Sequence, residues 1–430
     1  MRSESAGNTR LRSARQAQGL RSQQQLAEAV TAAGAQIGLR ISINERTVRR
    51  WESENPPWPH PDHQAAIEHL FNRPITELGF VPPWASGDLP VPPHERPIPP
   101  ITAGLAVAPF AAFARRVLAN PLPASIATDY ITITSAYRHM YWIIPPAQLH
   151  DAVATHVKLG VVLVASVPEA ARRSLAAAIS ESSLLAGRIE FFDMQIPQQA
   201  QQSFVTALQG AQDARDSMLG AAVLAHMTFI PAFSGDAKRA EEARDHMRAA
   251  RTFARRASAP PIMLAWLDAV EAEAETRFGD TRKALQLIRH AETIFADEEP
   301  RPAPAWLDWF SETRLAGFKG NTLLIARQPG PAKETLQTVL DQLTGDEEQK
   351  QRSVILGDLA AVAVSENDPE GACRLAEMAL DQLARTWYAT GMARVRAVRE
   401  SLSQWQSLPC VHQLDERLYD WNTTINALAS

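Results

Sequence analysis

Cysteine is scarce in this sequence, which has only Cys373 and Cys410 in 430 residues. Neither belongs to a closely spaced pair of the kind that binds zinc, and two isolated thiols provide no disulfide framework. The scarcity therefore argues against a disulfide-stabilised secreted domain and against a structural zinc module. It is typical of a protein from a reducing compartment.

Long apolar runs are also absent. The segment GVVLVA at residues 160–165 is far too short to cross a bilayer, and no apolar segment follows the charged N-terminus. We therefore expect a cytoplasmic protein that has no membrane-spanning part.

The common catalytic and nucleotide-binding motifs are missing as well. No P-loop, glycine-rich dinucleotide turn or G-x-S-x-G segment occurs in the chain. The histidine-rich segment at residues 60–69 lacks the i, i+4 histidine pair with a nearby carboxylate that a zinc enzyme would show. We therefore expect neither an enzyme nor a bound metal or cofactor.

Lysine is missing from the first 52 residues, although arginine is abundant there. This stretch has nine arginines and four glutamates, whereas the formal net charge of the whole chain is -5. A small basic N-terminal part on an acidic remainder indicates local contact with phosphate groups.

Two short amphipathic helices are predicted near the N-terminus. The segment TRLRSARQAQG begins with Thr9 as a plausible N-cap and ends at Gly19. The segment SQQQLAEAVTAAG has Ser22 as its N-cap and Gln25 at the capping-box position.

A third helix is predicted in the segment SINERTVRRWE, with Asn44 as its N-cap. Val48 and Trp51 lie on one face and must be buried against the two preceding helices. The side chains of Arg46, Arg49 and Arg50 then remain outside. This is the helix-turn-helix arrangement, whose recognition helix enters the major groove of DNA. The alternative is an ordinary solvated basic face.

A proline-rich stretch, VPPWASGDLPVPPHERPIPP, follows this region and predicts a semi-rigid linker. We expect an N-terminal domain at residues 1–84, the linker at 85–109 and a helical domain at 110–430. The N-terminal domain is called the head below, and the C-terminal domain the body.

The body contains three segments that can be aligned with one another, starting at Asp236, Asp280 and Asp368. Each begins with a potential helix cap and has an alanine at the fourth following position: Ala240, Ala284 and Ala372. Units of roughly 40 to 50 residues made of helix pairs are typical of an α-solenoid. We expect an all-α protein with a body similar to tetratricopeptide (TPR) repeats. An irregular all-helical bundle is the alternative.

The head resembles the XRE, or lambda-repressor-like, family of helix-turn-helix domains over residues 8 to 80. The resemblance rests on LRSARQAQGLRSQQQLAEAV and on NERTVRRWE. With the prolines that follow, and with AYRHMYWIIPP (136–146) and LLAG (184–187), the chain resembles a large actinobacterial group of such regulators. Members of that group have a C-terminal tetratricopeptide-like domain.

The family resemblance implies a set of DNA-binding residues. By position, Gln23 would contact a phosphate, Glu45, Arg46 and Arg50 would reach base edges, and Thr47 and Arg49 would anchor the backbone. Ser22 and Asn44, at the starts of the second and third helices, complete the set. The implied partner is double-stranded DNA.

Repeated aromatic residues in the body suggest a ligand site. Trp266 precedes Glu271 and Trp309 precedes Arg314 at the same separation, and Trp306 and Asn321 lie close by in the sequence. A concave helical surface with these groups suits an extended peptide or an amphipathic small molecule. The alternative is that the tryptophans belong to the core between helices.

Together these features predict a sequence-specific DNA-binding transcriptional regulator whose body senses a peptide or small-molecule signal. One short reading helix makes few base contacts, so we expect a homodimer formed through the body. The alternative is a protein-interaction scaffold of TPR type with an accessory or vestigial DNA-binding head.

Overall fold

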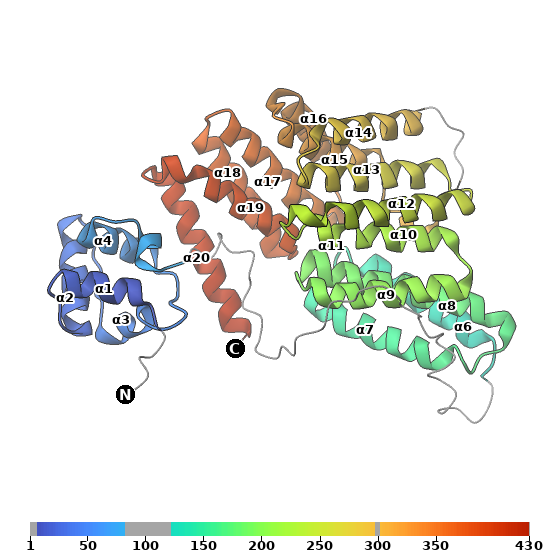
Figure 1. The fold of residues 1–430 in the computed structure, drawn as a ribbon, viewed down its shortest axis with the longest axis horizontal. Coiled ribbons are helices and arrows are strands. Elements are labelled where there is room, and N and C mark those ends of the chain that lie inside the picture. Colours follow the sequence, from blue (N-terminus) through green and yellow to red (C-terminus); the bar gives the residue numbers. More distant parts are fainter. Residues whose placement is uncertain (1–6, 82–121, 297–301, 430) are drawn as a thin grey trace. The chain divides into compact units, whose positions relative to one another are not determined.

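The computed structural model describes residues 7–81, 122–296 and 302–429, and these ranges contain helices and no strand (Figure 1). This confirms the all-α prediction. The chain separates into two compact units, one within residues 1–98 and 396–430 and the other within 99–395. Residues 396–430, which the sequence analysis includes in the body, thus group with the first unit. The predicted linker at 85–109 lies outside the described residues.

The first unit has a compact core of short helices. Its elements are α1 (Thr9–Ala17), α2 (Gln23–Gln36), α3 (Glu45–Trp51), α4 (Pro61–Phe71), the 3-10 helices η1 (Ile75–Leu78) and η6 (Leu402–Trp405), and α20 (Pro409–Ala429). Leu26, Val48, Trp51 and Ile67 are among the buried residues that join α2, α3 and α4.

Asn8, and not the predicted Thr9, caps the first helix. Its Oδ1 accepts a hydrogen bond from the Leu11 amide at 3.2 Å, and its Nδ2 donates to the Trp51 carbonyl, also at 3.2 Å. The cap therefore also ties α1 to the end of α3. Gly79 approaches this side chain so closely, with φ +84°, that a Cβ there would lie 2.2 Å from Asn8 Oδ1.

The connection between α2 and α3 is long but packed. Ile43 is buried, and its amide donates to Thr31 Oγ1 on α2 at 3.1 Å. Ile41 lies against Gly34, where an added Cβ would be 2.6 Å from Ile41 Cδ1. These contacts hold α3 in a defined position after an extended loop.

The second unit consists of consecutive helices that pair side by side (Figure 1). In chain order these are α6 (Ser125–Met140), α7 (Pro146–Leu163), α8 (Glu169–Arg188), the π-helix η2 (Ile189–Asp193), α9 (Pro197–Ala214), α10 (Ser217–Met227), α11 (Phe229–Ala232), η3 (Ala237–Arg239), α12 (Ala240–Arg256), α13 (Pro261–Arg277), α14 (Thr281–Ala296), η4 (Ala305–Leu307), α15 (Glu312–Ile325), α16 (Pro329–Gln342), η5 (Asp346–Glu348), α17 (Gln349–Ser365) and α18 (Pro369–Arg385). The helix α19 (Ala389–Ser401) begins in this unit and ends in the first. The most extensive contacts join α8 with α9, α10 with α12, α13 with α14, α15 with α16, and α17 with α18.

The two helices of each pair differ in sequence pattern. In α13 and α17 buried residues occur all around the helix, whereas α12, α14 and α18 each bury a single stripe. A helix that is apolar on all sides belongs between two layers, and a helix with one apolar stripe covers it from outside. The first helix of each pair is therefore the inner one.

The three aligned segments form the outer helices α12, α14 and α18, but Ala240 is only half-buried, whereas Ala284 and Ala372 are buried. In α14 the buried positions begin at Ala284, and in α18 they begin at Gly371, directly before Ala372. In α12 they begin at Ala243, three residues after Ala240. The reason is that Asp236 caps the short helix η3, which delays the start of α12.

Candidate functional site

The helix α3 has one buried side and one exposed side. Val48 and Trp51 are at most 3% exposed, as predicted, and the Trp51 ring packs edge-on against Phe80 and His63. Asn44 Oδ1 accepts a hydrogen bond from the Thr47 amide at 2.9 Å and caps the helix. This packing fixes the rotation of α3, so its arginine-bearing side faces away from the core.

A buried carboxylate follows directly after this helix. Glu52 is 2% exposed, and its Oε1 accepts a hydrogen bond from Arg15 Nε at 2.6 Å. Its Oε2 accepts one from Gln23 Nε2 at 2.9 Å. Glu52 thereby connects α1, α2 and the end of α3. The Gln23 amide, predicted to contact a phosphate, donates to this carboxylate.

Several other predicted DNA-binding side chains also have partners within the first unit. Ser22 Oγ caps α2 by accepting from the Gln25 amide at 3.1 Å. Thr47 Oγ1 donates to Asn44 Oδ1 at 3.0 Å, and Arg49 forms an ion pair with Glu45 at 2.7 Å. These contacts leave Arg46 and Arg50 as the members of the predicted set whose side chains have no bonding partner within the described ranges.

Arg46 and Arg50 are exposed and are four residues apart on α3. Side chains at this separation are neighbours on one helix face, and two like charges there repel each other. The preceding pair, Glu45 and Arg49, has the same spacing but opposite charges. The face of α3 that carries Arg46 and Arg50 is therefore an uncompensated cationic surface.

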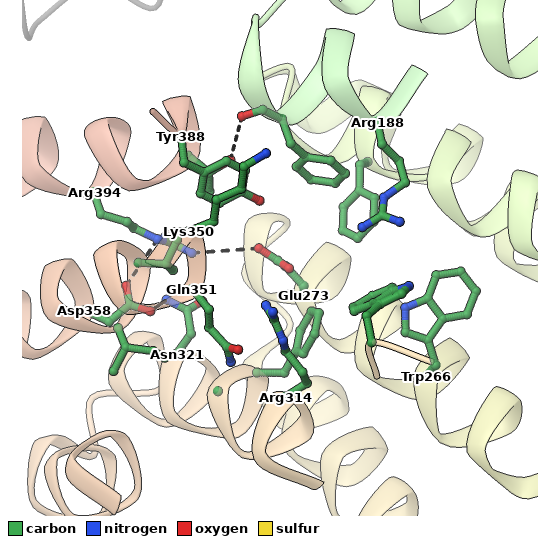
Figure 2. Close-up of a pocket in the computed structure, with 18 of the residues that line it drawn as sticks. Arg188, Trp266, Glu273, Arg314, Asn321, Lys350, Gln351, Asp358, Tyr388 and Arg394 are labelled. Carbon is green, nitrogen blue, oxygen red and sulfur yellow. Dashed lines mark hydrogen bonds and ion pairs between the residues drawn. The ribbon is translucent and has the colours of Figure 1, made fainter. Parts of the chain in front are cut away.

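The second unit contains a cavity of about 160 Å3 (Figure 2). Side chains from the inner helices α8, α10, α13, α15 and α17 line it, together with residues of η2, α11 and α19 and of the segments that follow α6 and η4. None of its lining residues comes from the outer helices α9, α12, α14, α16 and α18.

Four of the six residues predicted for a ligand site line this cavity: Trp266, Trp309, Arg314 and Asn321. Trp306 instead lines a smaller adjacent cavity. Glu271 lines neither cavity, because Arg251 at 2.9 Å and Lys283 at 2.8 Å hold its carboxylate in an ion-pair network between helices. Trp266 is also 1% exposed and belongs to the core between helices, as the alternative interpretation expects.

One end of the cavity is built from paired charges. Arg394 Nε lies 3.2 Å from Asp358 Oδ1, and Arg394 Nη2 lies 3.8 Å from Glu273 Oε1. Asn321 Nδ2 donates to Asp358 Oδ2 at 3.1 Å. Figure 2 shows Arg394 and Asp358 on the side of the lining opposite Arg188 and Trp266.

The π-helix η2 lies against the last part of this unit. Asp193 Oδ1 accepts a hydrogen bond from Lys350 Nζ at 2.7 Å, and its carbonyl accepts one from Trp387 Nε1 at 3.1 Å. Thr390 Oγ1 donates to the Phe192 carbonyl at 3.2 Å. Short π-helical segments often occur at functional sites. Here the segment brings inner helices that are distant in sequence to the same cavity.

The aromatic end of the cavity holds two arginines. The Arg188 guanidinium lies 4.9 Å from the ring centres of both Tyr141 and Trp309, and 5.6 Å from that of Trp142. The Arg314 guanidinium lies 4.8 Å from the Trp142 ring centre. Neither guanidinium has a carboxylate or hydrogen-bond partner in the described part of the chain. Burial, with the charge of Arg188, lowers the pKa of Arg314 to about 10.

His226 also lines the cavity but contributes no charge at neutral pH. Its Nδ1–H donates to the Ala222 carbonyl at 2.8 Å. Burial, reinforced by the positive charge of Arg188, lowers the pKa of His226 to about 3. The imidazole is therefore neutral in the folded chain at pH 7.

Several residues of the cavity were not anticipated from the sequence. Tyr141 and Trp142 fall within AYRHMYWIIPP, and Arg188 directly follows LLAG, so the segments that carry the family resemblance mark their positions. Lys350 and Tyr388 stand in no recognisable motif. Only the fold brings them to the cavity.

Residues 7–81, 122–296 and 302–429 have neither a metal-binding cluster nor a membrane-spanning helix. No group of histidine, cysteine or acidic side chains there is arranged to hold a metal ion. No helix in those ranges has the length and apolar character needed to cross a bilayer.

Comparisons with known proteins give no family assignment: no family model matches the chain, and no curated protein matches it. The placement of side chains is therefore the basis for inferring the function.

Proposed function

We propose that the protein is a transcriptional regulator of the XRE type, which binds double-stranded DNA through α3 of its N-terminal helix-turn-helix domain. The observation that carries the proposal is the exposed pair Arg46 and Arg50, which lies opposite the buried Val48 and Trp51. Arginine donates in a planar fork that matches both a phosphate and the O6/N7 edge of guanine.

In this proposal α3 is the recognition helix and α2 the helix before it. Arg46 and Arg50 read base edges. Glu45 can accept from a cytosine amino group only if its ion pair with Arg49 opens. Gln23 positions α2 through Glu52, and its remaining amide hydrogen and oxygen are available to the DNA backbone.

The second unit is the TPR-like sensing and dimerisation part of the proposed regulator. The cavity between its inner helices supports sensing of a small molecule. Dimerisation is supported by Ile133 and Met140, which are seven residues apart on one face of α6 and are both 43% exposed. Two copies would present two recognition helices to an inverted repeat.

Footprinting with the intact chain on the DNA upstream of its own gene tests the proposal at physiological salt. We expect protection of a two-fold symmetric site whose half-sites are about one helical turn, or a multiple of it, apart. If the protein shows no preference for any duplex over random DNA, specific DNA binding is excluded. A protein-interaction scaffold with an accessory head would then be the better interpretation.

A further inference from the structure

We infer that the cavity of the second unit binds an organic anion with an apolar body about the size of one aromatic ring, and that Arg188 and Arg314 hold its anionic group. This inference rests on the sensing half of the proposed function and specifies the chemical class of the signal.

Charge balance in the cavity supports an anionic ligand. Lys350 is paired with Asp193, and Arg394 is paired with Asp358. Arg188 and Arg314, in contrast, form no hydrogen bond or ion pair in the described ranges, although Arg188 is 9% exposed. The carboxylates of Asp193 and Glu348 act on them only at longer range. A buried cation without a counter-ion is costly to keep, so it is most simply explained by an anion that enters the site.

The geometry also suits a single anionic group. Both guanidinium groups lie over the ring of Trp142, at 5.6 Å and 4.8 Å from its centre. Both donor forks therefore lie beside the Trp142 side chain, and both arginines line the cavity. A carboxylate is the matching acceptor, because its two oxygens can accept parallel hydrogen bonds from a guanidinium.

The rest of the lining determines the body of the ligand. Aromatic side chains, including Phe229, Phe233 and Trp266, line the cavity beside the two arginines. The cavity volume of about 160 Å3 is close to the roughly 150 Å3 of apolar space that accommodates benzene. Aromatic and short aliphatic carboxylates therefore match both the size and the chemistry of the site.

The probes are benzoate, phenylacetate and hexanoate, each compared with its uncharged amide. Binding to the intact chain is measured by calorimetry and by tryptophan fluorescence, since Trp142, Trp266 and Trp309 line the cavity. We expect saturable binding of at least one carboxylate and at least tenfold weaker binding of the corresponding amide. The inference is wrong if no carboxylate binds at millimolar concentration, or if the amides bind equally well.

Substitutions separate a ligand-binding role from a structural one. Arg188→Gln and Arg314→Gln should each lower the carboxylate affinity at least tenfold. Arg282→Gln, on the exposed side of the outer helix α14, should leave the affinity unchanged. Unchanged affinity in both cavity variants would overturn the assignment.

The melting temperature of the ligand-free protein provides the second readout. We expect Arg314→Gln to keep or raise it, because the substitution removes a largely desolvated charge that forms no ion pair in the described ranges. A large fall in melting temperature would mean that Arg314 is structural, and this would count against the inference. If Arg188→Gln does not fold, Arg188→Lys, which keeps the charge but loses the planar fork, should show weaker carboxylate binding.

The outcomes distinguish this inference from the proposed function. Arginine-dependent carboxylate binding without any effect on DNA affinity would leave the ligand class standing and remove the sensing role. Specific DNA binding by a chain that binds no carboxylate would leave the DNA-binding function standing and remove the ligand class.

Discussion

Lys350 Nζ lies 2.7 Å from Asp193 Oδ1, across 157 residues of sequence, and both side chains are at most 1% exposed. The contact joins the π-helix η2 to the inner helix α17. Burial lowers the pKa of Lys350 and raises that of Asp193, so the attraction between them offsets only part of the cost of desolvation. The pair therefore determines where α17 lies more than it adds to the net stability.

Breaking this pair on one side should be more harmful than removing both partners. Lys350→Met leaves Asp193 buried without its cation and should lower the free energy of unfolding by about 3 to 5 kcal/mol. The double variant Lys350→Met/Asp193→Leu should lose clearly less. Urea denaturation of the intact chain, followed by tryptophan fluorescence, measures both. The single variant Asp193→Leu completes the comparison. If the losses of the two single variants simply add in the double variant, this account is wrong.

The arginines on α3 should govern specific DNA binding. Arg46→Ala or Arg50→Ala should weaken binding to the footprinted site by about 1 to 3 kcal/mol, while binding to random duplex weakens less. Fluorescence anisotropy with both duplexes gives the two affinities. Arg73→Ala, an exposed arginine of the same unit outside α3, is the matched control. Equal losses on both duplexes would leave only phosphate contact.

The carboxylate of Glu52 should stabilise the first unit. Glu52→Gln leaves Arg15 buried without its anion and should lower the free energy of unfolding of this unit by about 3 kcal/mol. Hydrogen exchange of residues 45–51 in the intact chain measures the local loss. Glu54→Gln, at an exposed position two residues away, should have little effect. If the α3 amides are equally protected from exchange in both variants, Glu52 does not connect α1, α2 and α3 as described above.

His226 should make the second unit sensitive to acid. Its pKa is about 3 in the folded chain and about 6.5 when unfolded, so the folded state binds fewer protons between these values. The stability that the folded chain gains from keeping His226 neutral is complete above pH 6.5 and is lost as the pH falls towards 3. We expect a loss of about 2 kcal/mol between pH 7 and pH 5.

Stability curves of the His226→Gln variant test this assignment. The variant should lose less stability between pH 7 and pH 5 than the unmodified chain, whatever its stability at pH 7. His139→Gln, at an exposed position in the same unit, should follow the unmodified chain. Identical pH slopes for His226→Gln and the unmodified chain would assign the acid sensitivity to other groups.

The exposed apolar face of α6 should contribute to dimerisation. Ile133→Glu/Met140→Glu places two charges on this face and should convert the dimer to a monomer at micromolar concentration. Light scattering of the intact chain reports the mass. Met378→Glu, which replaces another exposed apolar residue on the outer helix α18, should remain dimeric. An unmodified chain that is monomeric at this concentration would rule out the dimer itself.

The helices could be predicted well from the sequence, because apolar spacing and helix caps depend on residues that are close together in the chain. The buried stripe of α3 follows from the spacing of Val48 and Trp51, and the caps at Ser22, Asp280 and Asp368 follow from single polar residues before apolar runs. The cap of α1 was assigned to Thr9 instead of Asn8, because both neighbouring residue types can cap a helix. The bond that also ties Asn8 to the Trp51 carbonyl, 43 residues away, cannot be read from local sequence.

The cavity could be predicted only in part for the same reason. Trp309 and Arg314 stand close together in the sequence and point to a site by their types alone. Arg188 and Lys350 reach it from α8 and α17, which sequence spacing does not relate. Glu271 has an equally suggestive position, but the neighbouring Arg251 bonds to its carboxylate.

The hydrogen bond from Thr390 to the Phe192 carbonyl, across 198 residues, has a consequence for the order of events during synthesis. The core residues of the first unit from Leu11 to Phe80 emerge from the ribosome first and can pack early. The cavity cannot close until Thr390 has been made, about 310 residues after Phe80. At roughly 5 to 20 residues per second this takes about 15 to 60 s. A nascent chain therefore has the core residues of the first unit well before it has the complete cavity.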